Sequence, residues 1–259
     1  MIEVNLKQIV ESLIDTFISV GKISLELRKK GLTKEIKSDN TPVTNADLEV
    51  NKLLTKKLIE LTPDFPIVSE ETSDNKSIEN LKNFWLVDPI DGTYDYINNK
   101  DEFTINAGLI MNRRPVAGLI NAPAQNRMFY SYGKGLAFEI TKGELIKLNC
   151  KKKTSNKSIK VVCYSTKLNP EIEKKYKEFG VTENIRMKSS LKFCVIAAGE
   201  YDGYIAEPRA SEWDIAAGHA ILKDAGGIIT DFDNNEILYG KKNFKNPSLI
   251  LRRSKILSE

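Results

Sequence analysis

Histidine is almost absent from this chain of 259 residues, and cysteine is rare. A lone histidine, His219, excludes a zinc site built on several imidazoles, and we expect it to be a structural residue with satisfied hydrogen bonds. The three cysteines, Cys150, Cys163 and Cys194, are odd in number and lack a CxxC spacing. We therefore expect them to be reduced core residues of a cytoplasmic protein.

Long apolar runs are absent too. No stretch approaches the ~18 apolar residues of a membrane span, and Glu3, Lys7, Glu11 and Asp15 interrupt the apolar residues near the N-terminus. Such a pattern is unlike a signal peptide. The sequence thus predicts a cytoplasmic protein without integral membrane association. It leaves open a peripheral contact of the basic surface with a membrane, and assembly into a homodimer.

Positive charge is only slightly in excess: the formal net charge is +4, and the lysines are scattered along the chain. The one short basic run, Lys151-Lys152-Lys153, is interpreted as a solvated loop, so no nucleic-acid partner is expected. The excess suits an anionic small molecule, although weakly. With 41% hydrophobic and 29% charged residues, the composition is that of an ordinary soluble globular protein of one large domain or two smaller ones.

Hydrophobic periodicity predicts helices and strands along the whole chain. Helices are expected at about 5–30, 44–58, 170–179, 190–198 and 213–225. Strands are expected at 67–69, 84–87, 103–110, 116–121, 128–132, 161–164, 203–206, 228–230 and 249–251. A polar, lysine-rich stretch at 150–158 is the expected boundary between an α+β half, residues 1–150, and an α/β half, residues 151–259.

Two aspartates lie in one short motif at 88–93, Asp-Pro-Ile-Asp-Gly-Thr. A buried strand is expected to run into Asp88, the proline to stop its ladder, and a helix to open at Thr93. Asp88, Asp91 and the Ile90 carbonyl can then face one point, next to the N–H groups of a helix N-terminus, which favour an anion. Hard oxygen ligands beside an anion pocket suit Mg²⁺. The alternative is an Asp-Gly turn with a capping aspartate.

Further acidic residues stand at the ends of predicted elements. Glu70 and Glu71 follow the apolar strand 67–69, where their repulsion is costly unless a cation relieves it; the alternative is ordinary surface decoration. Asp214 lies in the first turn of a helix of small residues, which would let that helix pack closely and bring Asp214 inward. Its alternative role is to complement the helix dipole. Asp47 fits the acidic position of a capping box that begins at Thr44.

In this order the acidic segments resemble the inositol monophosphatase superfamily of metal-dependent, lithium-sensitive phosphatases. The shared motifs are Glu70-Glu71, the segment 88–93 and the segment 213–218, Trp-Asp-Ile-Ala-Ala-Gly. Within the superfamily, the chain is most similar to the bacterial 3'(2'),5'-bisphosphate nucleotidases. That likeness rests on the segments KSDNTPVTNAD (37–47), LTPDFPIVSEE (61–71), FWLV (84–87), EFTIN (102–106) and SSLKFC (189–194). The resemblance extends from about residue 5 to residue 250.

The resemblance implies a layered α/β/α/β/α sandwich with the active site between its two halves. It also implies two or three Mg²⁺ ions in each active site. Glu70, Asp88 and the Ile90 carbonyl would hold one ion, and Asp88, Asp91 and Asp214 would hold the second. The N-terminal half would thus carry most of the ligands, and the C-terminal half would supply Asp214 and substrate contacts.

The resemblance further implies roles around the attacking water. Asp47 would hydrogen-bond Thr93, whose hydroxyl would orient the water together with Glu70. With no histidine or cysteine in these motifs, a covalent phosphoenzyme has no nucleophile except an aspartate already engaged as a ligand. The residues expected to contact the substrate are Asp91, Gly92, Thr93, Ser189, Lys192, Arg209 and Asp214. By the resemblance, Ser189 and Lys192 would contact the part of the nucleotide that is not cleaved, and Arg209 would add a second positive contact; the alternative is a capping serine and a solvated lysine.

The implied activity is hydrolysis of a small phosphate monoester, adenosine 3',5'-bisphosphate, to AMP and phosphate. An inositol 1-phosphate or other sugar phosphatase is the alternative within the same class. An RNA or transcription-complex accessory protein with vestigial catalysis is the alternative outside it, and the intact ligand set argues against it.

Two segments depart from the nucleotidase pattern and leave the substrate open. Tyr94-Asp95-Tyr96 stands where a Lys-Glu-Phe-like run is frequent, and the stretch 207–212 before Trp213 is shorter than usual. Glu207 lies seven residues before Asp214, where inositol phosphatases carry a glutamate that binds a sugar hydroxyl. Both segments would border the substrate pocket.

Overall fold

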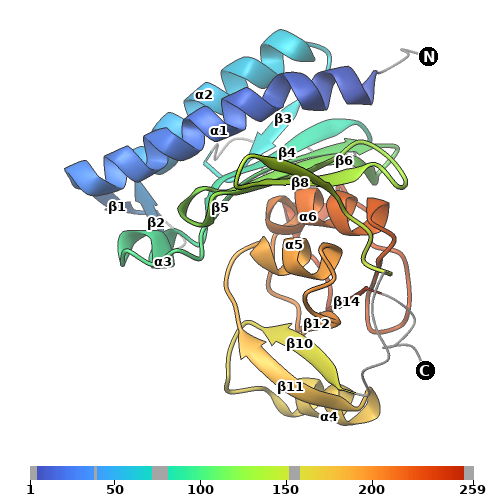
Figure 1. Cartoon of the computed structure of the whole chain (residues 1–259). Coiled ribbons are helices and arrows are strands. Elements are labelled where there is room, and N and C mark those ends of the chain that lie inside the picture. The colour runs from blue at the N-terminus through green and yellow to red at the C-terminus, as the bar shows by residue number, and fades with distance from the viewer. Residues whose placement is uncertain (1–4, 38–39, 72–80, 152–157, 254–259) are drawn as a thin grey trace.

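The computed structural model of the protein describes residues 5–37, 40–71, 81–151 and 158–253. These residues form five layers, in the order helices, sheet, helices, sheet, helix (Figure 1). The layered α/β/α/β/α sandwich is thereby confirmed. Ser38 and Asp39 of the 37–47 motif, and Lys152 and Lys153 of the basic run, lie outside the described residues.

Two long helices, α1 (Leu6–Lys30) and α2 (Asn45–Leu61), form the first layer and cover one face of the larger sheet (Figure 1). Helix α1 buries Val10, Leu13 and Phe17 on one stripe, as its period of apolar residues predicts. Helix α2 begins with the predicted capping box, in which Thr44 and Asp47 bind each other's backbone N–H groups.

The larger sheet has seven strands in the order β3-β4-β5-β6-β7-β8-β9. Strand β3 is parallel to β4, and the other neighbours are antiparallel. The bounds are β3 Ile67–Ser69, β4 Phe84–Asp91, β5 Thr104–Met111, β6 Arg114–Ala122, β7 Arg127–Ser131, β8 Ala137–Thr141 and β9 Glu144–Lys147. Because helices cover both faces of β4, β5 and β6, these strands are buried almost along their whole length.

The middle layer consists of α5 (Leu191–Ala197) and α6 (Glu212–Asp224). Helix α6 lies against β5 and β6 at very short range. A Cβ atom added to Gly118 would stand 2.3 Å from the Ala217 carbonyl oxygen, and one added to Gly108 would stand 2.7 Å from the Ala216 Cβ. The small residues on both sides therefore allow the close packing that the sequence predicts for this helix.

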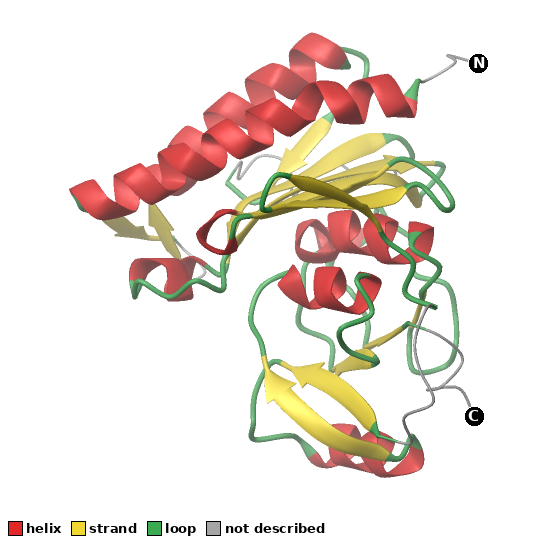
Figure 2. Cartoon of the chain, viewed as in Figure 1, coloured by secondary structure: helices red, strands yellow, loops and turns green. Residues whose placement is uncertain are grey.

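A second sheet and one outer helix complete the layers. The strands of the second sheet follow the order β11-β10-β12-β14-β13, and α4 (Pro170–Glu178) covers the outer face of this sheet (Figure 2). The strand bounds are β10 Ile159–Cys163, β11 Val181–Arg186, β12 Gly203–Ala206, β13 Ile228–Thr230 and β14 Leu249–Arg252. Smaller elements are the hairpin strands β1 (Lys34–Ile36) and β2 (Pro42–Thr44), the short helix α3 (Thr93–Ile97), and the 3₁₀ turns η2 (Pro123–Gln125) and η3 (Lys242–Phe244).

The structure corrects the expectation that Pro89 ends its strand. Strand β4 continues to Asp91 after an irregularity in its pairing with β5: Asp88 pairs with Asn106, and Asp91 with Thr104. The proline removes one donor, and the chain accommodates the loss with a local shift of register. The helix expected at Thr93 is present as α3.

Other expectations about composition are met. Cys150, Cys163 and Cys194 are free and buried. His219 is buried, and its Nδ1 lies 3.0 Å from the Tyr239 hydroxyl, so it is a satisfied structural histidine. Among the described helices, none is both long and apolar enough to cross a membrane.

Candidate active site

Parallel pairing of β3 and β4 brings two acidic strand ends together. The Glu70 N–H donates to the Val87 carbonyl at 3.1 Å, so Glu70 lies beside the strand that leads into Asp88. Asp88 itself is 1% exposed. After the register shift that follows Asp88, Asp91 lies at the same end of β4, near Glu70 and Asp88. The sequence order of the acidic motifs thus becomes a spatial cluster.

Asp214 joins this cluster from the first turn of α6. One carboxylate oxygen each from Glu70, Asp88 and Asp214 lies within 4.8 Å of the others. Asp214 is fixed by a capping box, in which its Oδ2 accepts the Ser211 N–H at 2.7 Å. Asp214 therefore lies in the first turn of α6, where it can complement the helix dipole as considered above, and it also belongs to the cluster.

The cluster is electrostatically strained because its carboxylates are buried together. Neither carboxylate oxygen of Asp88 has a hydrogen-bond partner among the described residues. Burial, and then the charges of Glu70 and Asp91, raise the pKa of Asp88 well above its ordinary value. Burial and the neighbouring acids raise the pKa of Asp214 in the same way. A divalent cation would relieve this repulsion, and a set of carboxylate oxygens is the donor set that Mg²⁺ prefers.

Asp91 is held from the opposite side by the N-terminus of α5. Its Oδ2 accepts the Ser190 N–H, and the Ser190 hydroxyl donates to Asn106 at 2.7 Å. Burial raises the pKa of Asp91 to about 6, although Lys192 and the Ser190 N–H oppose the shift. Asp91 is therefore oriented by Asn106 on β5 and by Ser190, the residue before α5, neither of which the sequence singled out for this purpose.

Thr93 and Asp47 meet at the same end of β4. The Thr93 hydroxyl lies 2.9 Å from the Ile90 carbonyl oxygen and 3.3 Å from Asp47 Oδ1. The other oxygen of Asp47, Oδ2, accepts the Thr44 N–H at 2.8 Å. Asp47 can thus cap α2 and contact Thr93 at once, as the sequence analysis expects.

Gly92 makes the turn from β4 into α3 possible. Its φ of +91° lies in the left-handed region, and an added Cβ would stand 3.2 Å from the Glu102 carbonyl oxygen. Helix α3 is only five residues long, so its dipole is small and the individual N–H groups of Gly92 and Thr93 are the relevant donors.

A lysine that the sequence analysis gave no role bridges the two glutamates. Lys37 Nζ lies 3.1 Å from Glu70 Oε1 and 2.8 Å from Glu71 Oε1. Burial raises the pKa of Glu71 to about 7, against the opposing effect of Lys37. Glu71 therefore faces Lys37, whereas Glu70 contacts both Lys37 and the aspartate cluster.

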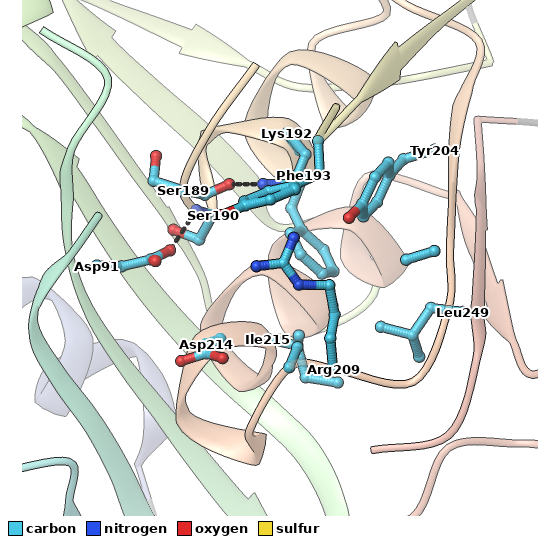
Figure 3. Close-up of a pocket in the computed structure, with 13 residues that line it drawn as sticks. Asp91, Ser189, Ser190, Lys192, Phe193, Tyr204, Arg209, Asp214, Ile215 and Leu249 are labelled. Carbon is cyan, nitrogen blue, oxygen red and sulfur yellow. Dashed lines mark hydrogen bonds between the residues drawn. The ribbon is translucent and has the colours of Figure 1, made fainter. Parts of the chain in front are cut away.

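A pocket opens next to the cluster and is lined by Asp91 and Asp214 together with Ser189, Lys192 and Arg209 (Figure 3). Ser189, Lys192 and Arg209, which were predicted to contact the substrate, thus share one cavity with the two aspartates. Lys192 is 7% exposed and donates to the Ser189 carbonyl. Burial lowers the pKa of Lys192 to about 8. The Arg209 side chain extends into the pocket.

Two aromatic residues and a second lysine near the pocket were missed by sequence reasoning. Tyr164 and Tyr204 line the pocket, and the Lys188 Nζ lies 3.6 Å from the centre of the Tyr164 ring. No motif marks them, because a single tyrosine after a strand and a lysine in a loop are common in any sequence. Glu207 lies outside this cavity: it lines a neighbouring pocket and accepts a hydrogen bond from Asn169.

Comparisons with known proteins agree on one family. A model described as the inositol monophosphatase family matches residues 5–257. The 3'(2'),5'-bisphosphate nucleotidase CysQ of Aggregatibacter actinomycetemcomitans is 33% identical over 86% of this chain and 84% of that protein. The CysQ of Escherichia coli strain K12 is 33% identical over 82% of this chain and 85% of that protein.

Solved structures point the same way. CysQ from Bacteroides thetaiotaomicron, described as a bacterial member of the inositol monophosphatase family, is similar with a TM-score of 0.71 and 26% identity, over 93% of this chain and 96% of that one. The IMPase of Thermotoga maritima has a TM-score of 0.75 at 24% identity, over 95% and 94% of the two chains, and bears on the fold alone.

Proposed function

Because the chain belongs to the inositol monophosphatase family of phosphomonoesterases, we propose that it removes the 3'-phosphate of adenosine 3',5'-bisphosphate, which yields AMP and phosphate. The observation that carries this proposal is the convergence of Glu70, Asp88 and Asp214 from three separate elements beside a pocket. The choice of a nucleotide is supported by the relatives, named 3'(2'),5'-bisphosphate nucleotidase, that match at 33% identity.

We propose that Glu70, Asp88 and the Ile90 carbonyl hold one Mg²⁺ ion, and that Asp88, Asp91 and Asp214 hold a second. The two unpartnered oxygens of Asp88 fit a residue shared between ions. When bound, such ions supply activation of water near neutral pH and stabilisation of the charge on the attacking and leaving oxygens. The number of ions, two or three, stays a prediction.

The chain's own residues position the reactants in this scheme. The Thr93 hydroxyl, set against Asp47 and the Ile90 carbonyl, orients the attacking water together with Glu70. The N–H groups of Gly92 and Thr93 and the buried Lys192 stabilise the negative charge of the phosphate. Each of these groups is already in place in the fold, so little reorganisation is needed when the substrate binds.

A mechanism with a covalent phosphoenzyme is disfavoured by the same pocket. Its described lining includes no histidine and no cysteine, and its two aspartates are the ones assigned to metal binding. We therefore propose direct attack by water, oriented by Thr93 and Glu70, in preference to attack by one of the lining serines, Ser189 and Ser190.

The position of Glu207 bears on the alternative inositol or sugar phosphatase. Glu207 is exposed and bonded to Asn169 in the pocket next to the active-site pocket. A glutamate that binds a sugar hydroxyl close to the reacting phosphate would have to line the pocket of Asp91 and Asp214. This placement favours the nucleotide over the inositol ester.

A turnover panel tests the proposal. The protein is given adenosine 3',5'-bisphosphate, inositol 1-phosphate and fructose 1,6-bisphosphate in turn, with saturating Mg²⁺, and kcat/KM is measured by phosphate release. We expect the nucleotide to be preferred by at least ~10-fold, the scale of one or two specific polar contacts. A higher kcat/KM for the inositol ester would transfer the substrate assignment to the alternative. No turnover of any of the three would favour the accessory-protein alternative.

A further inference from the structure

Glu212 is a fully buried acid that the proposed chemistry does not use. It is the first residue of α6, two positions before Asp214, and its exposed fraction is 0%. Its carboxylate accepts the N–H of Gly240 at 2.8 Å and the N–H of Lys241 at 3.0 Å. The Lys241 Nζ lies 2.7 Å from Glu212 Oε1. Glu212 therefore anchors the start of α6 to residues 240 and 241.

Burial makes this anchor costly unless its hydrogen bonds are complete. A carboxylate that leaves water loses its hydration, and only well-placed donors and a cation can offset that loss. Glu212 has two backbone donors and one ammonium group, and neither of its oxygens is a buried atom without a partner. An acid that only complemented the helix dipole could stay at the surface. The burial of Glu212 therefore indicates that its contact with residues 240 and 241 holds the end of the helix.

Three further contacts join the segments 210–213 and 244–246. They are the N–H of Asn246 with the Ala210 carbonyl at 3.1 Å, the Lys245 ammonium with the Ser211 hydroxyl at 3.0 Å, and the rings of Phe244 and Trp213, whose centres lie 5.9 Å apart. Together with the contacts of Glu212, they connect every residue from 210 to 213 with the segment 240–246. The N-terminal end of α6 is therefore held by this segment.

The same turn of α6 fixes the carboxylate of Asp214. Asp214 Oδ2 accepts the Ser211 N–H at 2.7 Å, and the Asp214 N–H donates to the Ser211 carbonyl at 3.2 Å. The first N–H groups of a helix have no partners within the helix, so its first turn frays unless other contacts hold it. The large sheet contacts α6 further along, at Ala216 and Ala217. The first turn therefore depends on Glu212 and the segment 240–246.

We propose that Glu212 is a positioning residue: by holding the first turn of α6 against the segment 240–246, it directs the Asp214 carboxylate toward Glu70 and Asp88. The inference rests on the proposed function, because it takes Asp214 as a ligand of Mg²⁺. Among the described residues, Glu212 is not part of the carboxylate cluster, so it acts through Asp214. Residues that orient a metal ligand contribute to metal affinity without touching the ion.

A matched pair of substitutions tests this role. Glu212→Ala removes the anchor. Asp202→Ala removes another buried carboxylate of the same kind, which accepts the Lys160 N–H at 2.7 Å and pairs with Arg253. Asp202 lies just before β12 and does not line the active-site pocket.

Stability and Mg²⁺ affinity are measured separately for both variants. Urea denaturation in EDTA gives the free energy of unfolding, and calorimetric titration gives the affinity for Mg²⁺. We expect both substitutions to lower stability. Only Glu212→Ala should weaken Mg²⁺ binding, by about tenfold, whereas Asp202→Ala should leave it within about twofold of the wild type.

A second comparison shows whether Glu212 acts through Asp214. Asp214→Asn should itself weaken Mg²⁺ binding, and adding Glu212→Ala to it should cause no further loss, because the carboxylate that Glu212 positions is gone. Should Glu212→Ala fail to fold, Glu212→Gln replaces it in both comparisons. Glutamine keeps the length of the side chain and one acceptor oxygen, so we expect this variant to fold and to weaken Mg²⁺ binding about threefold.

The outcomes separate this inference from the proposed function. If Asp214→Asn weakens Mg²⁺ binding and neither Glu212 variant does, the metal assignment stands and the positioning role is wrong. If Asp214→Asn binds Mg²⁺ as the wild type does, both are wrong. Equal losses of affinity in Glu212→Ala and Asp202→Ala, or a further loss in the Asp214→Asn background, would also overturn the positioning role. A loss that occurs only in the Glu212 variants, and only with Asp214 in place, supports it.

Discussion

Asp91, which we propose as a metal ligand, shows how burial changes the pKa of a carboxyl group in the metal-free protein. Its pKa is raised to about 6 from the ordinary 3.8. Because the folded-state value is the higher one, protonation of Asp91 stabilises the metal-free fold. This stabilisation is complete below about pH 4 and is lost as the pH rises through about 6. At neutral pH the ionised cluster therefore opposes folding unless a cation is present.

Most substitutions of buried residues lower stability, but replacing Asp91 with Asn should raise the stability of the metal-free protein. At about pH 8 in EDTA, we expect Asp91→Asn to unfold at a higher temperature than the wild type, by about 2–4 °C for each kcal/mol of repulsion removed. Near pH 4 this difference should vanish. Differential scanning fluorimetry at both pH values measures it.

With Mg²⁺ present, we expect the wild type to be more stable than Asp91→Asn. The wild type should gain stability with Mg²⁺, by roughly 3 kcal/mol when Mg²⁺ is about a hundredfold above its Kd, whereas Asp91→Asn should gain much less. Asp64→Asn, which removes an exposed carboxylate elsewhere, is the control and should respond like the wild type. An unchanged response of Asp91→Asn to Mg²⁺ would show that Asp91 is not a metal ligand.

Loss of catalysis in the ligand variants should be large. With saturating Mg²⁺, Asp91→Asn and Asp214→Asn should each lower kcat/KM by ~10²–10³ or more, the scale of removing one electrostatic stabiliser, ~3–4 kcal/mol. Circular dichroism checks that the fold persists. Activity close to that of the wild type in either variant would remove the two-metal assignment.

Substitution of Thr93 should affect the positioning of the attacking water and leave Mg²⁺ binding nearly unchanged. Its hydroxyl touches Asp47 and the Ile90 carbonyl, so Thr93→Ala should lower kcat and leave Mg²⁺ affinity nearly intact. Thr93→Ser, which keeps the hydroxyl, should recover most of the rate. Calorimetric Mg²⁺ titration and steady-state kinetics measure the two effects. A loss of Mg²⁺ binding as complete as in Asp88→Asn would mean that these roles are misassigned.

Among the secondary-structure elements, α6 links the sheet to the site. It carries Asp214 in its first turn and packs against Gly108 and Gly118 with no room for a side chain. Any shift of this helix away from the sheet would move Asp214 relative to Glu70 and Asp88. Close packing of small residues, rather than a long-range charge effect, thus sets the distance between Asp214 and the other proposed ligands.

Gly118→Ala tests this packing. The added methyl group would meet the backbone of Ala217, so we expect the free energy of unfolding to fall by about 1–3 kcal/mol and Mg²⁺ affinity to weaken. Gly135→Ala is the comparison, because a Cβ there meets no atom within 4 Å and only its φ of +74° is unfavourable. Urea denaturation gives both values. A Gly118→Ala protein with unchanged Mg²⁺ affinity would contradict the link between helix position and the site.

The elements that the sequence predicted are those with a strong apolar period. Helices α1 and α2 and the buried strands β4 to β7 fall in this group. Helix α6 is buried on almost all sides and was predicted instead from its small and apolar residues and the two glycines that follow it. Strand β9 was missed because all four of its residues are exposed, and β11 because nearly all of its residues are exposed, so neither shows an alternating pattern. Strand β8 was not predicted either. Pro89 was misjudged because its strand tolerates a register shift.

At the scale of the whole molecule, the site joins residues that are far apart in the chain. Glu70, Asp88 and Asp91 lie on one sheet edge, and Asp214 arrives from the other half through α6. The division near residue 150 stays a prediction, and one core cluster contains buried residues of both halves, such as Ile120 and Leu251. Homodimer formation likewise stays a prediction.

Carboxylate motifs made this convergence predictable from sequence. On the cationic side of the pocket, Lys192 and Arg209 were predicted by the resemblance, whereas Lys188 was not. Acidic residues at strand ends are rare enough to mark a site. Lys37 gains its contacts with Glu70 and Glu71, and Lys188 its contact with the Tyr164 ring, only from folding, because lysines are frequent throughout the chain and mark no site. The fold and the acidic cluster were therefore easier to predict from the sequence than the residues that select the substrate.

Phosphate release from adenosine 3',5'-bisphosphate, measured over a range of Mg²⁺ concentrations, tests the central claim most directly. We predict no release in EDTA, and a rise at low Mg²⁺ that is steeper than first order, because two ions must be bound before water attacks. Release that persists undiminished in EDTA, or its absence at every Mg²⁺ concentration, would contradict the assignment of a magnesium-dependent nucleotidase.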